Sequence, residues 1–517
     1  MTLDNMTYLQ GAFILTLVNL VTGILSFIYR IFLSKSIGAE GMGVYQLIMP
    51  LYMLFIQLVS GGLSTSISKL VAENKARHNY SNIGKTIKIA VLISGLWSVT
   101  FSSLIAFNAG FLANNILNDE RTFYSVIIFS PAIIFIALAA VLKGYFYGTE
   151  QVKIPALIDI AEKLIRLVVL IMTTNYLIDY GIEYICAGAM TAMVTGELLS
   201  LFLLYITYRR KKIIAAAAMR TDSAMFIISN MLKVVIPLSI SGAVNTILDM
   251  LDAALIPDQL IKAGFTKQLS LSLYGQLTGM VLPLIYFPMI IIGSLSITLI
   301  PSVAFSFTYK NWAVLNKKYN DSLTIASIIG LGATIAFMLF PKELCSVLFN
   351  CPQAGKLLFW SSIPCVLEYW LFVLMAIMNG LNFQGKVLES TILNIIIMVT
   401  SIIILMPMPR LNIYGYVIGL GISSLSVILS CLRIINKNTP IRVDTKKCIL
   451  KPILCAIPML AFISLANFHL TSYTNFRYNM MLSYILGSGI YAIMLLATGT
   501  IRPNQLLSVI GLKKPDA

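Results

Sequence analysis

Between Leu9 and Thr500 the chain contains about fourteen apolar stretches, each long enough for a helix to cross a bilayer. They are expected at residues 9–33, 43–68, 84–108, 122–145, 153–175, 182–208, 232–256, 271–304, 319–340, 357–381, 387–408, 413–436, 450–468 and 479–499. Only 11% of the residues are charged, against about 25% in soluble domains. Because the apolar runs are continuous and do not alternate, we expect an all-α integral membrane protein with no sizeable soluble domain.

Segments from the first half of the chain return in the second half. Gly61–Glu73 and Gly293–Phe305 agree at five of thirteen positions. We call the shift that carries position 61 to position 293 the repeat offset. A second match pairs Gly144 with Gly380, at nearly the same offset. Two similar offsets predict a duplicated bundle, an architecture that many transporters use to place a substrate site between two halves.

The net charge of +16 is distributed as membrane topology requires. With the N-terminus in the cytoplasm, the cytoplasmic connections and tail hold 26 Lys and Arg residues and the external connections hold 9. This bias satisfies the positive-inside rule and predicts that both termini are cytoplasmic. Arg209–Lys212 is expected to lie against anionic lipid. The charge therefore indicates membrane lipids as partners and no nucleic acid.

Metal and catalytic chemistry have little support in the sequence. The two histidines, His78 and His469, lie in predicted loops, and the seven cysteines form no CxxC pair, so we expect no metal centre. No external loop exceeds about 17 residues, which disfavours a glycosyltransferase or polymerase with a catalytic external loop. We therefore expect no catalytic residue, no enzyme activity and no cofactor beyond a coupling ion.

Four ionisable residues, Asp159, Glu162, Lys163 and Arg166, lie within the fifth predicted span. Their spacing of i, i+3, i+4 and i+7 places them on one helix face, and charges at membrane depth are costly and mark function by default. Glu162 and Arg166 are positioned to pair, which would leave Lys163 and Asp159 freer to meet a ligand. The alternative is a structural stripe of ion pairs that locks this helix to a neighbour.

The first span carries two basic residues near its end, Arg30 and Lys35. Both could extend to the external head groups, which is the interpretation we favour for Lys35. Alternatively, Arg30 points inward and supplies positive charge for a phosphate-bearing substrate.

The seventh span carries Asp249 and Asp252, which share a helix face, and the eleventh offers Glu389 and Asn394 as further oxygen ligands. These residues form a candidate site for a coupling ion, Na⁺ or H⁺. The alternative is that one aspartate pairs with a base of the first half and the other is protonated.

Single acids lie in the sixth and tenth spans, Glu197 and Glu368. Each is a candidate proton carrier. Each could instead be capped by a neighbouring hydroxyl group.

Three segments carry a family resemblance: Arg30–Tyr45, Lys143–Gly148 followed by Pro155, and Glu162–Arg166. They resemble the polysaccharide-transport branch of the multidrug/oligosaccharidyl-lipid/polysaccharide (MOP) exporter superfamily. The first segment resembles the end of the first helix in that branch, the second its Arg-Gly-Tyr-Phe-Gln-Gly pattern, and the third its Glu-Gln-x-x-Arg pattern. The length and the repeat fit the stage V sporulation protein B group of that branch.

This resemblance implies two pseudo-symmetric six-helix lobes and two further helices. The first lobe would occupy residues 1–212 and would be followed by a cytoplasmic linker at residues 213–230. The second lobe would occupy residues 231–440, and spans 13 and 14 together with the tail would occupy residues 441–517. It implies alternating access to a lipid-linked sugar, with the last two helices holding the polyprenyl tail. The related MviN-type lipid II flippases use several cavity arginines, but the second and eighth spans here contain none.

The expected function is a flippase that moves a lipid-linked oligosaccharide, a peptidoglycan precursor for spore cortex synthesis. Its location would be the cell membrane, including the membrane around the forespore, with cell-wall synthesis proteins as partners. The alternatives are a cation-coupled multidrug exporter of the same superfamily, an integral-membrane glycosyltransferase or polymerase, and a scaffold. A drug exporter would have a cavity dominated by acids and aromatic side chains.

Overall fold

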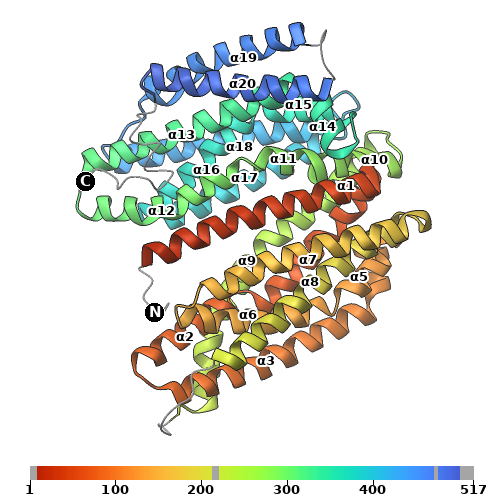
Figure 1. Cartoon of the computed structure of the whole chain (residues 1–517), viewed down its shortest axis with the longest axis vertical. Helices are drawn as coiled ribbons and strands as arrows, with labels where there is room; N and C mark the ends of the chain where they lie inside the picture. Colours follow the sequence, from red (N-terminus) through yellow and green to blue (C-terminus); the bar gives the residue numbers. More distant parts are fainter. Residues whose placement is uncertain (1–7, 212–220, 471–475, 501–517) are drawn as a thin grey trace. The chain divides into compact units, whose positions relative to one another are not determined.

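The computed structural model describes residues 8–211, 221–470 and 476–500, and in these residues every regular element is a helix (Figure 1). Contacts divide the chain into two compact units. The first unit comprises Met1–Asp258 and Phe265–Gly279, and the second comprises Gln259–Gly264 and Met280–Ala517. Residues 212–220 and the predicted tail from residue 501 lie outside the described residues.

The helices of the first unit, and α9 that leaves it, are α1 (Tyr8–Ser60), α2 (Leu63–Ala76), α3 (Tyr80–Phe107), α4 (Ala109–Phe111), η1 (Leu112–Ile116), η2 (Glu120–Thr122), α5 (Phe123–Phe129), α6 (Ala132–Gly148), α7 (Lys153–Leu177), η3 (Ile178–Tyr180), α8 (Ile182–Lys211), α9 (Ala224–Lys262) and α10 (Lys267–Tyr274). The π-helix η4 (Gly275–Val281) follows α10 and continues into the second unit.

The helices of the second unit are α11 (Leu282–Tyr286), α12 (Met289–Thr308), α13 (Trp312–Leu339), α14 (Pro341–Phe349), α15 (Ala354–Ser362), α16 (Cys365–Gly380), α17 (Gln384–Leu405), α18 (Tyr414–Asn438), η5 (Lys446–Leu450), α19 (Lys451–Leu470) and α20 (Phe476–Ala497).

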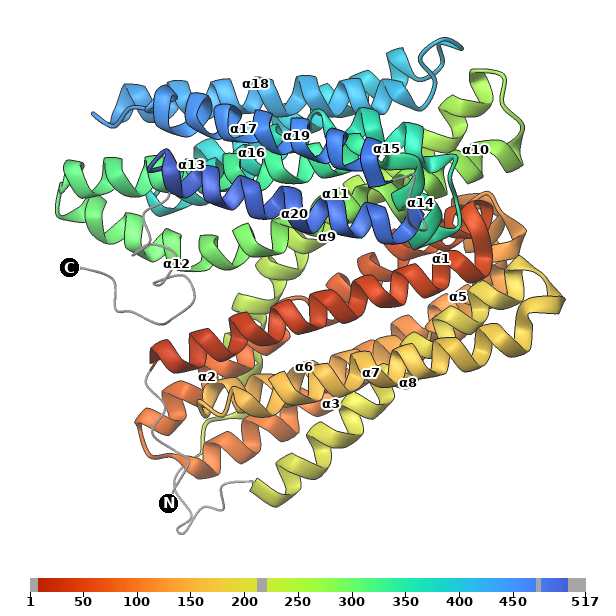
Figure 2. The same cartoon turned by 45° about the horizontal axis from the view of Figure 1, so that its top comes forward.

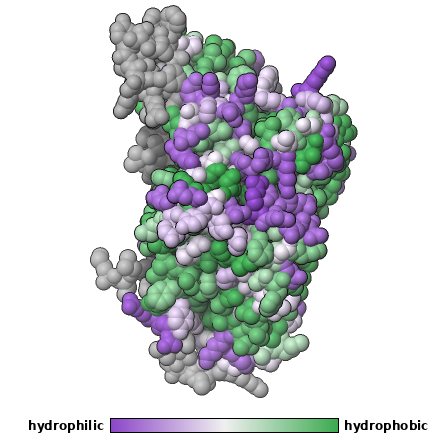
Figure 3. Space-filling model, turned by 90° about the vertical axis from the view of Figure 1, so that its right-hand side faces the viewer, coloured by the Kyte–Doolittle hydropathy of each residue, from purple (hydrophilic) through white to green (hydrophobic). Residues whose placement is uncertain are grey.

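Eleven helical stretches in the described residues are long and apolar enough to cross a membrane, or twelve if α15 and α16, bent by 51°, form one span. The predicted number of fourteen is therefore not confirmed. Helix α1 includes the first expected span, 9–33, and most of the second, 43–68. The two are separated by a kink at Gly38, where φ and ψ are not helical (66° and −169°), but they are counted as one stretch. The count is also lower because α7, which carries Asp159, Glu162, Lys163 and Arg166, is not among these stretches and Leu482–Ala497 is shorter than a span. The predicted eighth span, 271–304, is instead divided into two apolar stretches, Lys267–Tyr286 and Met289–Thr308. The all-α membrane fold itself is confirmed, and apolar side chains cover much of the face seen in Figure 3.

The core of the first unit lies between α2, α3 and α6, whose helices run alongside one another in Figure 2. Ile67, Val71 and Phe146 are fully buried there, together with Met231 of α9. Two further hydrogen bonds tie α9 to this unit: the Ser66 hydroxyl donates to the Met231 carbonyl (3.2 Å) and the Ser239 hydroxyl to the Gly61 carbonyl (2.7 Å). Helix α9 up to Asp258 therefore belongs to the first compact unit, and the start of a second lobe at residue 231 stays a prediction.

The duplication inferred from sequence is visible in two matching helix contacts. A Cβ atom placed on Gly148 would lie 2.6 Å from the carbonyl oxygen of Ser68 and 2.7 Å from Cβ of Val71. A Cβ atom on Gly380 would lie 2.8 Å from the carbonyl oxygen of Ile300 and 2.9 Å from Cβ of Val303. Each of these three positions is shifted by the repeat offset, so α2 and α6 correspond to α12 and α16. Gly380 therefore corresponds to Gly148, one helical turn after the Gly144 that the sequence match indicated.

The turns of the two halves repeat at the same offset. His78 and Lys310 both adopt positive φ, at 55° and 53°, and so do Glu150 and Asn382, at 66° and 63°. Asn79 caps α3 in the first half, and Asn311, one repeat offset later, caps α13 in the second. Because non-glycine residues rarely adopt positive φ, two such pairs at one offset support a duplicated bundle.

The last two helices, α19 and α20, pack against each other and against α13 in the second unit. The Tyr491 hydroxyl donates to the Ile328 carbonyl (3.2 Å) and the Tyr484 hydroxyl to the Ala336 carbonyl (2.5 Å). These bonds satisfy two phenol groups at membrane depth. The predicted pair of additional helices is thus attached to the second unit through α13.

Candidate functional site

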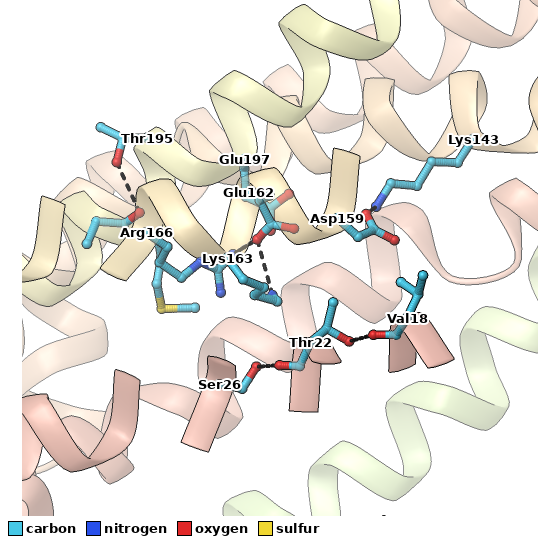
Figure 4. A network of polar contacts seen from close by, with 12 residues as sticks. Val18, Thr22, Ser26, Lys143, Asp159, Glu162, Lys163, Arg166, Thr195 and Glu197 are labelled. Atoms are coloured by element: carbon cyan, nitrogen blue, oxygen red, sulfur yellow. Dashed lines mark hydrogen bonds and ion pairs between the residues drawn. The ribbon is translucent and has the colours of Figure 1, made fainter. Parts of the chain in front are cut away.

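A network of six charged side chains crosses the first unit between α6, α7 and α8 (Figure 4). Arg166 forms ion pairs with Glu162 and, at 2.9 Å, with Glu197 of α8. Lys163 lies 3.1 Å from Glu162, and Lys143 of α6 lies 2.7 Å from Asp159. The four charges of α7 share one face, as their spacing predicts, and that face meets the neighbouring helices.

The network is balanced, with the three cations Lys143, Lys163 and Arg166 facing the three carboxylates Asp159, Glu162 and Glu197. The predicted pairing of Glu162 with Arg166 is confirmed. The expectation that Lys163 and Asp159 stay freer for a ligand is wrong, because Lys163 also pairs with Glu162 and Asp159 pairs with Lys143. The observed geometry is that of the alternative, a stripe of ion pairs joining α7 to its neighbours.

Helix α1 lies beside α7 and brings neutral hydroxyl groups near the network (Figure 4). The Thr22 hydroxyl donates to the Val18 carbonyl (2.9 Å), and the Ser26 hydroxyl donates to the Thr22 carbonyl (2.8 Å). These groups add hydrogen-bonding capacity to the region but no charge.

Arg30, one helical turn beyond Ser26, is partly buried and points toward the backbone of η4. Its Nη1 donates to the carbonyl oxygen of Thr278 at 3.3 Å, and Nε2 of Gln46 donates to the same oxygen at 2.6 Å. Among the described residues, no carboxylate pairs with Arg30. Lys35 is exposed, as the head-group interpretation predicts. The structure therefore separates the two basic residues, with Arg30 turned inward.

Two glycines bring the Thr278 carbonyl close to Arg30. A Cβ atom on Gly43 would lie 2.1 Å from the carbonyl oxygen of Leu271, and one on Gly275 would lie 2.1 Å from that of Ala39. Any side chain at either position would therefore push α1 away from α10 and the start of η4. The two glycines are again one repeat offset apart, so this crossing joins corresponding positions of the two repeats.

The four residues proposed as a coupling-ion site belong to different units. Asp249 and Asp252 lie on α9 in the first unit, and neither has an ion-pair partner among the described residues. Glu389 and Asn394 lie on α17 in the second unit. Glu389 is exposed and pairs with Lys386 at 2.8 Å. The described residues contain no group of three or more His, Cys, Asp or Glu side chains that could hold a metal ion.

The two single acids have different surroundings. Glu197 shares the Arg166 guanidinium with Glu162, so it belongs to the charged network. Glu368 accepts a hydrogen bond from the Ser424 hydroxyl of α18, which is the capped arrangement that we gave as the alternative to a proton carrier.

Sequence reasoning did not assign a site role to Lys143, although it lies at the end of an apolar run. Lys143 and Asp159 are equally distant along the chain from residue 151, in the short turn between α6 and α7, so they lie at the same depth in adjacent helices. That symmetry was a usable signal. A second unpredicted cluster joins Arg121 to Glu40 (2.7 Å) and Asp119 (2.8 Å) beside the turn before α5, and no local spacing relates Glu40 to the other two.

The chain matches a known protein family and a similar protein over most of its length. The family model described as polysaccharide biosynthesis protein matches residues 8–307. Stage V sporulation protein B of Bacillus subtilis (strain 168) is 27% identical over 513 residues, which are 98% of this chain and 98% of that protein.

Two solved structures share the fold. The lipid II flippase MurJ in an inward closed conformation has a TM-score of 0.69 at 15% identity, over 95% of this chain and 100% of that chain. A multidrug resistance MATE family transporter of the MOP superfamily, in an inward-facing conformation, has a TM-score of 0.63 at 15% identity, over 82% of this chain and 98% of that chain.

Proposed function

Because the chain belongs to the polysaccharide biosynthesis protein family and is related to transporters of the MOP superfamily, we propose that it flips a lipid-linked oligosaccharide across the membrane. The proposed substrate is a polyprenyl-linked peptidoglycan precursor of the lipid II type, used for spore cortex synthesis. The names of two similar proteins, stage V sporulation protein B and lipid II flippase MurJ, support this choice. The flippase would move the substrate across the membrane without making or breaking a covalent bond, so we propose no enzymatic activity.

The observation that carries this proposal is the inward-facing Arg30, which has no carboxylate partner among the described residues. The six-residue network is already neutral by pairing, so Arg30 is the cation best suited to meet an external anion. A diphosphate cannot cross hydrocarbon unaided because its charges would lose their hydration. A guanidinium group binds phosphate through charge-assisted hydrogen bonds, and Arg30 would supply such bonds while the polyprenyl tail stays in the bilayer.

We further propose alternating access driven by a coupling ion, Na⁺ or H⁺, with no other cofactor. Asp249 and Asp252 support this step because they share one face of α9 and have no basic partner among the described residues. Both termini would lie in the cytoplasm, and the protein would work with cell-wall synthesis proteins in the cell membrane and around the forespore.

A second candidate function is cation-coupled drug export in the same fold. The likeness to a MATE family transporter supports it, as do the two aspartates of α9. It would give no role to Arg30, which has no carboxylate partner among the described residues, because its positive charge would repel a cationic drug.

The test is translocation of a lipid-linked peptidoglycan precursor in vesicles reconstituted with the full chain. Loss of a hydrogen bond to a charged group costs about 1.5–3 kcal/mol, so Arg30→Ala should slow translocation about ten- to hundredfold. Lys35→Ala, which removes an exposed cation of the same helix, should stay close to the wild-type rate.

A wild-type rate for Arg30→Ala would contradict the proposed role of Arg30. Export of a cationic dye without movement of the precursor would favour the drug exporter.

A further inference from the structure

A groove of about 800 Å³ lies on the first unit between α3, α6 and α8. Its walls are apolar, formed mainly by Val91, Leu138, Leu142, Leu198 and Phe202. Val91, Leu198 and Phe202 are exposed, so the groove opens outward from these three helices. Since these helices cross the membrane, the occupant must come from the bilayer and must have an apolar part.

One end of the groove is basic. Lys88 near the start of α3 and Arg209 and Arg210 near the end of α8 line it, and the Arg209 guanidinium lies 6.0 Å from the centre of the Tyr205 ring. The lining residues include no acid. Among the described residues none of these three cations forms an ion pair.

The C-terminal turn of a helix favours cations through the helix dipole, which accounts for an arginine at the end of α8. It does not account for Lys88, which comes from the opposite end of another helix and converges on the same cavity. Three cations from two helices, at the mouth of an apolar groove, match a ligand with one anionic group and hydrocarbon chains.

We propose that this groove binds an anionic phospholipid, with its acyl chains along the apolar walls and its phosphate between Lys88 and the two arginines. A zwitterionic lipid fits less well because its ammonium group would face the same three cations. The lipid-linked substrate also fits less well, because no residue of the network around Glu162 lines the groove. The site is therefore separate from the proposed transport site and does not depend on the proposed function.

The experiment measures binding of phosphatidylglycerol to the purified full chain in detergent by native mass spectrometry. The variant Arg209→Gln/Arg210→Gln removes two of the three cations. From a loss of about fivefold for each cation near a lipid phosphate, removal of two cations should weaken binding about twenty-five-fold. The matched control Arg433→Gln/Lys437→Gln removes two exposed cations from the end of α18 in the second unit and should change binding less than twofold.

A second variant tests the cavity without changing any charge. Val91→Trp places a large side chain at the exposed edge of the groove and should also weaken phosphatidylglycerol binding, with the three cations intact. Folding should tolerate this change because the Val91 side chain is exposed on the outer face of α3.

Equal losses in the α8 and α18 variants would show diffuse electrostatic attraction and overturn the site. Wild-type affinity in Val91→Trp would show that the groove is not used. Phosphatidylcholine binding as tightly as phosphatidylglycerol would remove the role of charge. Displacement of phosphatidylglycerol by a lower concentration of undecaprenyl phosphate would assign the groove to the polyprenyl lipid instead.

Discussion

Removing Arg166 and Glu197 together should destabilise the protein by less than the sum of the two single removals, because the two side chains form one balanced network. Arg166 is 11% exposed and holds Glu162 and Glu197, which are 5% and 16% exposed. In Arg166→Gln the network is left with one excess negative charge. Because breaking a buried ion pair by deleting one partner costs about 3–5 kcal/mol, we expect a loss of stability in that range.

The double variant Arg166→Gln/Glu197→Gln restores neutrality, since Glu162 retains Lys163 at 3.1 Å. Glu197→Gln alone leaves one excess positive charge and should cost about 1–3 kcal/mol. The double variant should therefore lose about 1–3 kcal/mol less than the sum of the two single variants. This coupling free energy is the quantity that a network of ion pairs predicts and that independent side chains do not.

The assay is equilibrium unfolding of the purified chain in mixed micelles with increasing denaturant, with the midpoint compared at constant m value. The exposed pair Lys386 and Glu389, 2.8 Å apart and 52% and 62% exposed, is the matched control. Its coupling should be about 0.2–1 kcal/mol. Effects at Arg166 and Glu197 that add within about 0.5 kcal/mol would refute the network.

Gly148→Ala and Gly380→Ala should each destabilise the chain by about 1–3 kcal/mol through overpacking. The control Gly84→Ala, whose Cβ would meet nothing within 4 Å, should stabilise it by up to about 1 kcal/mol. Unfolding midpoints compare the three variants, and a wild-type midpoint for Gly148→Ala or Gly380→Ala would contradict the prediction. Burial alone would raise the pKa of the Asp119 carboxyl, but the hydrogen bonds and charge of Arg121 outweigh it and lower that pKa. A lowered pKa gives stability that is present above the ordinary value of about 3.9 and is lost as the pH falls through the folded-state value. The difference in Tm between wild type and Asp119→Asn should thus be largest near neutral pH and shrink below about pH 4; a constant difference would contradict it.

The helical class and the duplication could be predicted because both rest on local sequence. Continuous apolar runs determine which segments become helices, and the repeat offset is preserved in the contacts of Gly148 and Gly380. The number of spans could not be predicted in the same way. Hydropathy does not reveal that the expected span 357–381 is broken into α15 and α16, which are bent by 51°.

The charged face of α7 could be predicted from spacing, but its partners could not. Spacing within one helix places Glu162 beside Arg166, whereas Lys143 and Glu197 come from neighbouring helices. Without them the face seemed to have charge left for a ligand. The same limit applies to Arg30, because its inward direction depends on the carbonyl of Thr278, which is remote in the sequence.

The contrast between Arg30 and the network bears on how transport variants should be interpreted. Loss of transport in an Arg166 variant would not identify a substrate contact. Arg166 also pairs with two carboxylates, and leaving them without this partner lowers the stability of the protein. Among the described residues, Arg30 donates only to the neutral carbonyl of Thr278. Removal of Arg30 leaves that carbonyl with a second donor, Gln46. A defect in Arg30→Ala without a fall in unfolding stability would therefore reflect the missing positive charge itself. For this reason Arg30, and not the denser network on α7, is the residue at which binding of an anionic head group should be tested first.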